Sequence, residues 1–107
     1  MRMRIGGYVA FSGDLEPDVD GAAIALRRVG FHVTRMPEKF RPLLAHPDDD
    51  FIEVAIDGTD DEKVIDSIMA EINAIVDRYD GLLDECGPIP SNRVPFEEFF
   101  EALPRWH

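Results

Sequence analysis

Residues 51–81 read FIEVAIDGTDDEKVIDSIMAEINAIVDRYDG and contain the clearest strand and the clearest helix of the chain. Apolar residues alternate with other residues over 52–57, which is the period of a strand with one buried face. Residues 59–62 read TDDE, a capping box that predicts the start of a helix. Apolar residues then recur at helical spacing up to Tyr79, and the Asp80-Gly81 turn predicts the end of that helix.

The first part of the chain predicts a strand, a helix and another strand. Apolar residues at odd positions from Met3 to Phe11 indicate a strand. Pro17 suits the first position of a helix, and aspartates next to it suit the positive end of the helix dipole. Gly30 predicts the stop of that helix, and residues 31–34 form a second short strand. Residues 37–50 are expected to be a long connection, and 82–86 (LLDEC) a fourth strand.

The order β-α-β-β-α-β predicts a single ferredoxin-like α+β domain over residues 1–107, with two helices on one face of a four-stranded antiparallel sheet. The other face is expected to be an open, mixed polar surface that carries Arg2, Arg4, Tyr8, His32, Thr34, Glu53, Ala55 and Asp57. Pro95 is predicted to start a short C-terminal helix with an apolar stripe at Phe96, Phe99, Phe100 and Leu103. That stripe must be buried against its own domain or against a second chain.

The composition is that of a globular protein, with 45% hydrophobic residues and a formal net charge of −11. Most of the acidic side chains lie after residue 45. This charge repels phosphate backbones and anionic membranes and favours basic partners, so neither nucleic acid nor membrane is expected as a partner. A single cysteine, Cys86, fits a reducing compartment, and the cytoplasm is the expected location. The apolar run after Arg4 is too short for a signal peptide.

The residues themselves do not single out a catalytic, cofactor or metal site. The acids that begin at Glu16 resemble the start of a calcium-binding loop, but the twelfth position is Arg27, and a cation there would repel calcium. His46 precedes three aspartates with no second histidine or cysteine nearby. Carboxylates are so frequent that no pair stands out for acid–base catalysis. No cofactor is expected either.

Three stretches resemble the bacterial regulators of ribonuclease activity B: ALRRVGFHVT, FIEVAIDGT and INAIVDRYDG, which with the element order span about residues 20–86. Family members typically continue Tyr-Asp-Gly with Trp-Gly, where this chain has Leu82-Leu83. The resemblance implies a ferredoxin-like fold and a non-catalytic, cytosolic protein that acts by binding a protein partner. In the family this partner is an endoribonuclease whose activity is restrained.

Three functions remain open from the sequence. The first is a regulatory, protein-binding module, with candidate contacts in two acidic segments, Asp48, Asp49 and Asp50, and Asp60, Asp61 and Glu62. The second is a small-molecule-binding or enzymatic domain that uses polar groups of the open sheet face or a dimer cleft, namely Tyr8, His32 and Glu53. The third is a self-associating module, a homodimer that buries the stripe of Phe96, Phe99 and Phe100.

Overall fold

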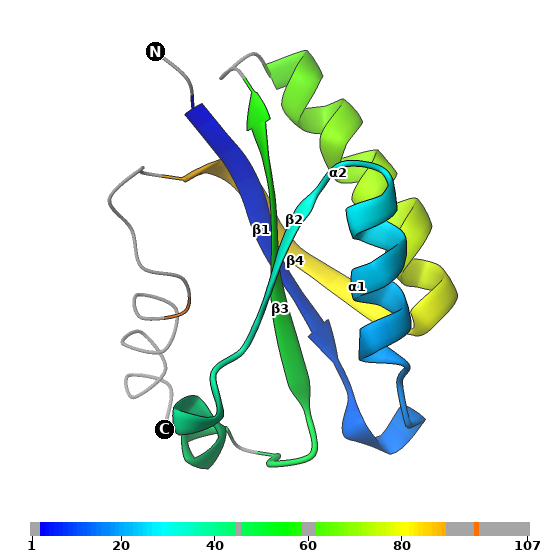
Figure 1. Ribbon diagram of the computed structural model, residues 1–107, viewed down its shortest axis with the longest axis vertical. Helices are drawn as coiled ribbons and strands as arrows, with labels where there is room; N and C mark the ends of the chain where they lie inside the picture. Colours follow the sequence, from blue (N-terminus) through cyan, green and yellow to red (C-terminus); the bar gives the residue numbers. More distant parts are fainter. Residues whose placement is uncertain (1–2, 45, 59–61, 90–95, 97–107) are drawn as a thin grey trace.

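The computed structural model describes residues 3–44, 46–58, 62–89 and 96 of the chain. Four strands form an antiparallel sheet in the order β2-β3-β1-β4, and two helices lie against one of its faces (Figure 1). The strands are β1 (Met3–Phe11), β2 (His32–Arg35), β3 (Asp50–Gly58) and β4 (Gly81–Ile89), and the helices are α1 (Val19–Arg28) and α2 (Glu62–Val76). The predicted ferredoxin-like α+β arrangement is therefore confirmed.

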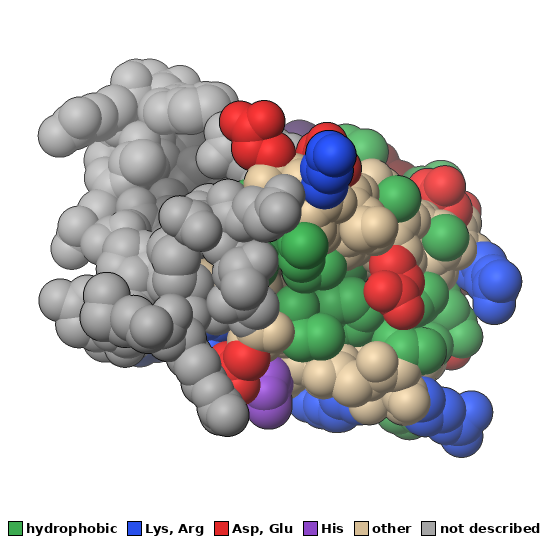
Figure 2. All heavy atoms as spheres, turned by 90° about the horizontal axis from the view of Figure 1, so that it is seen from above, with side chains coloured by type: hydrophobic (Ala, Val, Ile, Leu, Met, Phe, Trp, Pro, Cys, Tyr) green, Lys and Arg blue, Asp and Glu red, His purple; other side chains and the backbone are tan. Residues whose placement is uncertain are grey.

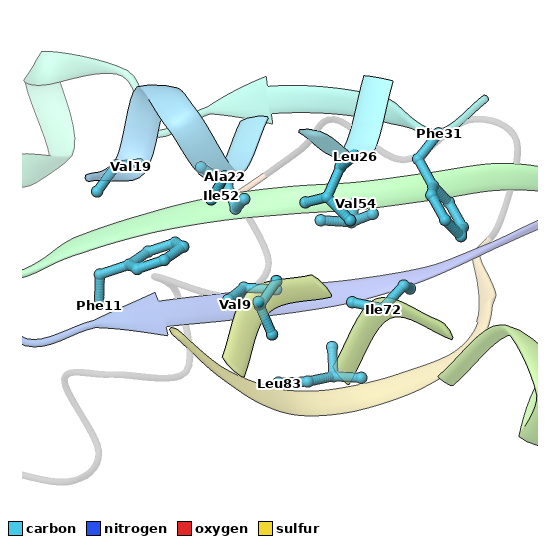
Figure 3. Packing of buried hydrophobic residues seen from close by; sticks show 11 residues of the cluster. Val9, Phe11, Val19, Ala22, Leu26, Phe31, Ile52, Val54, Ile72 and Leu83 are labelled. Atoms are coloured by element: carbon cyan, nitrogen blue, oxygen red, sulfur yellow. The ribbon is translucent and has the colours of Figure 1, made fainter. Parts of the chain in front are cut away.

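The main core lies between this sheet and the two helices. The alternating apolar residues of β1 and β3 point toward the helices, as the periodicity predicted. Figure 3 shows these side chains facing residues of α1 and α2. The most deeply buried members include Val9, Phe11, Leu26, Ile52, Val54, Ile72 and Val76. Burial of each large apolar side chain contributes about 1.5–3 kcal/mol, so this cluster is the main source of stability.

Both ends of α1 are capped by local sequence. Asp18 is the N-cap, and its carboxylate accepts a 2.9 Å hydrogen bond from the backbone N–H of Gly21. Pro17 was predicted to be the first helical residue, but α1 begins two residues later, at Val19. The reason is that Asp18 caps the helix, and an N-cap residue is itself not helical. At the other end, Gly30 has a φ of 103°, and the backbone N–H of Phe31 donates to the Leu26 carbonyl, which closes a Schellman motif.

The chain leaves α2 through Tyr79, Asp80 and Gly81, and local geometry explains the turn at Asp80 and Gly81. A one-turn helix, η3 (Asp77–Tyr79), follows α2, and Asp80 then takes a left-handed φ of 61°. A Cβ on Gly81 would lie 2.8 Å from the Phe11 ring and 2.9 Å from Val9, so only glycine fits there. The predicted turn is confirmed. The capping box expected at the start of α2 falls mostly on 59–61, outside the described residues.

The second face of the sheet carries its own apolar cluster and is not an open polar surface. Tyr8, Met36 and Phe96 are buried there, and Phe40, Leu44 and Phe51 pack against them. Phe40 comes from η2 (Glu38–Leu43), a short helix inside the predicted connection. Of the residues predicted for this face, the described ones do lie on the side of the sheet away from the helices. Four of them are exposed there: Arg4, His32, Thr34 and Asp57. Tyr8, Glu53 and Ala55 are buried instead. Arg2 lies outside the described residues.

Phe96 is the described residue of the predicted C-terminal helix. Its φ of 73° is incompatible with a right-handed helix, so no helix begins at this residue. Its ring packs 5.1 Å from the ring of Tyr8, and its backbone N–H donates to the Tyr8 hydroxyl at 3.1 Å. Within the described parts of the chain, no helix is both long and apolar enough to cross a membrane.

Candidate functional site

Two residues of the acidic segment 48–50, Asp49 and Asp50, form bonds that stabilise the fold. Asp49 accepts a 2.9 Å hydrogen bond from the backbone N–H of Gly13. Asp50 pairs with Arg35 at 2.7 Å and also accepts from the backbone N–H of Phe51. Of the three aspartates, Asp48 is exposed and its carboxylate forms no hydrogen bond or ion pair with the residues that the structure describes. The segment is therefore a bonded loop in which the Asp48 carboxylate has no partner among the described residues.

Two arginines fix the backbone of this loop. Arg35 links Asp50 to Asp20 in the first turn of α1, so the loop is joined to a helix. Arg41 donates to the carbonyl oxygens of Pro47 and Asp49, at 2.6 Å and 3.1 Å. Hydrogen bonds from a charged donor are about twice as strong as neutral ones, so these contacts restrain the loop.

A second acidic loop lies directly beside it. The one-turn helix η1 (Gly13–Leu15) joins β1 to α1, and a Cβ on Gly13 would lie 2.6 Å from the Asp48 carbonyl oxygen. Asp14 and Glu16 lie next to this contact, and Leu15 between them is 58% exposed. We call this surface the acidic end and define it as Asp14, Leu15, Glu16 and Asp48.

The contribution of η1 to the acidic end could not be predicted from the sequence. The acids at 14 and 16 are visible in the sequence, but only the long-range contact between Gly13 and Asp48 brings them to the loop. Conversely, the structure does not bring Glu62, the described residue of the second predicted protein-binding segment, to Asp48. Glu62 is exposed at the start of α2, and β3 separates it from Asp48 by about 27 Å of extended chain. Asp60 and Asp61 lie outside the described residues.

The polar groups predicted for the open sheet face are only partly adjacent. Glu53 stands directly opposite Tyr8 on β1 and opposite Thr34 on β2. Tyr8 lies where the β1–β4 register shifts, a feature that re-aims side chains. His32 pairs with Ala55 instead and is exposed.

Glu53 is unusual because its carboxylate is buried and has no polar partner among the residues that the structure describes. It is 4% exposed, and among the residues that the structure describes none hydrogen bonds or ion pairs with its side chain. Buried charged groups are normally paired, so an unpaired one is costly for folding. No interaction within the described part of the chain explains this carboxylate, and no sequence pattern predicted its burial.

Of the three residues predicted to form a self-association stripe, Phe96 is fully buried within its own chain. Phe99 and Phe100 lie outside the described residues. Within the described parts of the chain, no group of three or more His, Cys, Asp or Glu side chains is placed to hold a metal ion.

No protein-family model matches the chain, and no curated protein matches it in sequence. The resemblance to the regulators of ribonuclease activity B stays a prediction. The structure gives Tyr79, Asp80 and Gly81, its most distinctive residues, packing and turn roles.

Proposed function

We propose that this protein is a non-catalytic regulatory module that binds a basic surface of another protein through the acidic end. The observation that supports it best is the joining of two acidic loops, at Asp14–Glu16 and Asp48, around the exposed Leu15. Complementary charge steers association and selects the partner, while an exposed apolar side chain supplies contact area. The family resemblance makes an endoribonuclease the first partner to test.

The internal bonds of the acidic end favour binding. Asp49, Asp50 and the two arginines hold the loop, so little conformational entropy is lost when a partner contacts it. The acids that remain exposed are free to meet cations. A held acidic surface of this kind suits recognition of a basic partner.

The test is binding of a purified endoribonuclease, measured by fluorescence anisotropy at low and moderate salt. We expect the double variant Asp14→Lys, Asp48→Lys to weaken binding by at least about tenfold. The matched control, Asp57→Lys with Asp77→Lys, makes the same charge change at exposed positions elsewhere and should change binding by less than about twofold. Equal losses in both variants would show that net charge, and not the acidic end, drives binding.

The partner class can be tested without assuming an endoribonuclease. A photoreactive amino acid replaces Leu15 in one sample and Leu82, which is 71% exposed on β4, in another. The proposal predicts a basic protein cross-linked from position 15 only, and lost in the Asp14→Lys, Asp48→Lys background. Identical products from both positions would contradict it.

A second candidate function is binding of a small cationic ligand at the sheet. It is favoured by Glu53, which lies opposite Tyr8 and has no polar side-chain partner among the described residues. A carboxylate near aromatic rings recognises an amine by charge and by cation–π contact. A thermal-shift screen of aromatic and aliphatic amines tests this. A stabilising amine should lose its effect in Glu53→Gln, and a panel without any such amine would remove the candidate.

A further inference from the structure

The face of the sheet opposite the helices holds one aromatic ring inside an apolar cluster. The ring belongs to Phe96, whose side chain is fully buried and whose ring centroid lies 5.1 Å from that of Tyr8. The surrounding side chains come from β1, from the segment around η2 and from the start of β3. We call them the ring site and define it as Tyr8, Met36, Phe40, Leu44 and Phe51.

Phe96 shows which chemical group the ring site holds. Its ring packs in the cluster, and its backbone N–H donates a buried 3.1 Å hydrogen bond to the Tyr8 hydroxyl. In any phenylalanine, two carbon atoms, Cα and Cβ, separate the backbone nitrogen from the ring. The bound fragment therefore has the skeleton of a 2-arylethylamine, an aromatic ring joined to a nitrogen through two carbons.

Phe96 fits this site imperfectly in two respects. Its φ of 73° is a strained conformation for a residue with a large side chain. Its nitrogen also belongs to a neutral amide, which cannot neutralise a carboxylate. Glu53 is directly opposite Tyr8 in the β1–β3 pairing, is 4% exposed and has no polar side-chain partner among the described residues. A cation at the position of the Phe96 nitrogen would supply the partner that a buried carboxylate needs.

We propose that the ring site and Glu53 together bind a small 2-arylethylamine, and that Phe96 occupies the site when this ligand is absent. The ring of the ligand replaces the ring of Phe96. Its ammonium carries three N–H donors, so it can donate to the Tyr8 hydroxyl and also pair with Glu53. Residues directly opposite each other in an antiparallel pair have Cβ atoms about 5 Å apart on one face, which brings both acceptors to the same part of the sheet.

Other apolar side chains give no comparable indication of a ligand. Ile24, Val64 and Leu82 are exposed. Figure 2 shows exposed hydrophobic side chains among charged groups on the surface seen from above. Their described contacts do not define an occupant. The ring site differs because an aromatic ring already fills it and a polar group already bonds to the attached nitrogen.

This inference rests on the second candidate function, the binding of a cation by Glu53. It adds the aromatic half of the ligand and the competition with Phe96. A free ligand has no backbone, so it avoids the strained φ that Phe96 adopts. An amine that binds Glu53 without displacing Phe96 would satisfy the second candidate function but not this inference.

The first test compares three probes by isothermal titration calorimetry with the full chain at neutral pH. 2-Phenylethylamine has both the ring and the cation, 2-phenylethanol has the ring without a charge, and butylamine has the cation without a ring. We expect 2-phenylethylamine to bind at least about tenfold more tightly than either of the others. Glu53→Gln should remove its advantage over 2-phenylethanol. The matched control Asp57→Asn changes an exposed acid on the same face of β3 and should change each affinity by less than about twofold.

The second test removes the internal occupant. Phe96→Ala should bind 2-phenylethylamine at least about tenfold more tightly than the wild type does, because the ligand no longer competes with Phe96. Circular dichroism verifies that the variant is folded. Phe96→Leu keeps an apolar anchor without a ring, so it should show a smaller gain in affinity, and it replaces Phe96→Ala if that variant does not fold. The control Leu82→Ala shortens an exposed apolar side chain on β4 and should leave the affinity unchanged.

The inference and the function on which it rests fail in different ways. Equal affinity for 2-phenylethylamine and butylamine, lost in Glu53→Gln but unchanged in Phe96→Ala, would keep the second candidate function and overturn this inference. Equal affinity of Phe96→Ala for 2-phenylethylamine and 2-phenylethanol would also overturn it, because an apolar cavity alone would then account for binding of the ring. No binding of either amine to the wild type or to the Phe96 variants would reject both.

Discussion

The backbone N–H of Gly13 donates a 2.9 Å hydrogen bond to the carboxylate of Asp49, across 36 residues of sequence. This bond joins η1 to the loop before β3, and it brings the acidic residues of the two loops close together. An acid that stabilises the loop and an acid that contacts a partner in the proposed function therefore sit next to each other in sequence, at Asp49 and Asp48.

Replacement of Asp49 should affect stability more than replacement of Asp48. We expect Asp49→Ala to lower the free energy of unfolding by about 1 kcal/mol, because the Gly13 N–H loses its acceptor. Asp49→Asn keeps an acceptor oxygen and should cost less. The control Asp48→Ala should stay within about 0.5 kcal/mol of wild type in urea unfolding. A larger loss at Asp48 than at Asp49 would contradict this division of roles.

The strands and helices could be predicted because each depends on a local period. The alternation from Ile52 to Asp57 and the apolar row that ends in Val76 are visible in short windows, and so is the stop at Gly30. The acidic end and the burial of Glu53 depend on contacts between distant segments, which no local period encodes. The open sheet face was mispredicted for the same reason, since the residues that cover Tyr8 come from η2 and from Phe96.

Gly81 should tolerate no side chain. A methyl group there would meet the Phe11 ring and Val9, both of which are buried in the main core and cannot move aside. We expect Gly81→Ala to cost about 1–3 kcal/mol, measured by thermal and chemical unfolding. The control is Leu82→Ala at the next position, where the side chain is exposed and the change should cost about 0.5 kcal/mol or less. A neutral Gly81→Ala would mean that the strand can shift away from Phe11.

The capping hydrogen bond of Asp18 and the negative charge of its carboxylate should make separate contributions to the stability of α1. Asp18→Ala removes the acceptor for the Gly21 N–H and should cost about 1 kcal/mol, whereas Asp18→Ser retains a capping oxygen and should cost less. Equal losses in the alanine and serine variants would mean that the negative charge, through the helix dipole, matters more than the hydrogen bond. Unfolding in urea at low and high salt distinguishes the two, because only the charge effect is screened.

Removal of the Glu53 carboxylate should stabilise the protein. Its side chain is buried and has no polar partner among the described residues, so Glu53→Met exchanges a desolvated carboxylate for an apolar group of similar length. We expect the free energy of unfolding to rise by about 1–3 kcal/mol. The control Asp57→Met changes an exposed acid on the same face of β3 and should alter stability by about 0.5 kcal/mol or less. A destabilised Glu53→Met would show that an interaction in the folded chain supports this carboxylate. A stabilised one would mean that folding does not require Glu53, which is the expected behaviour of a residue kept for binding, and the amine screen would then be the place to look for its ligand.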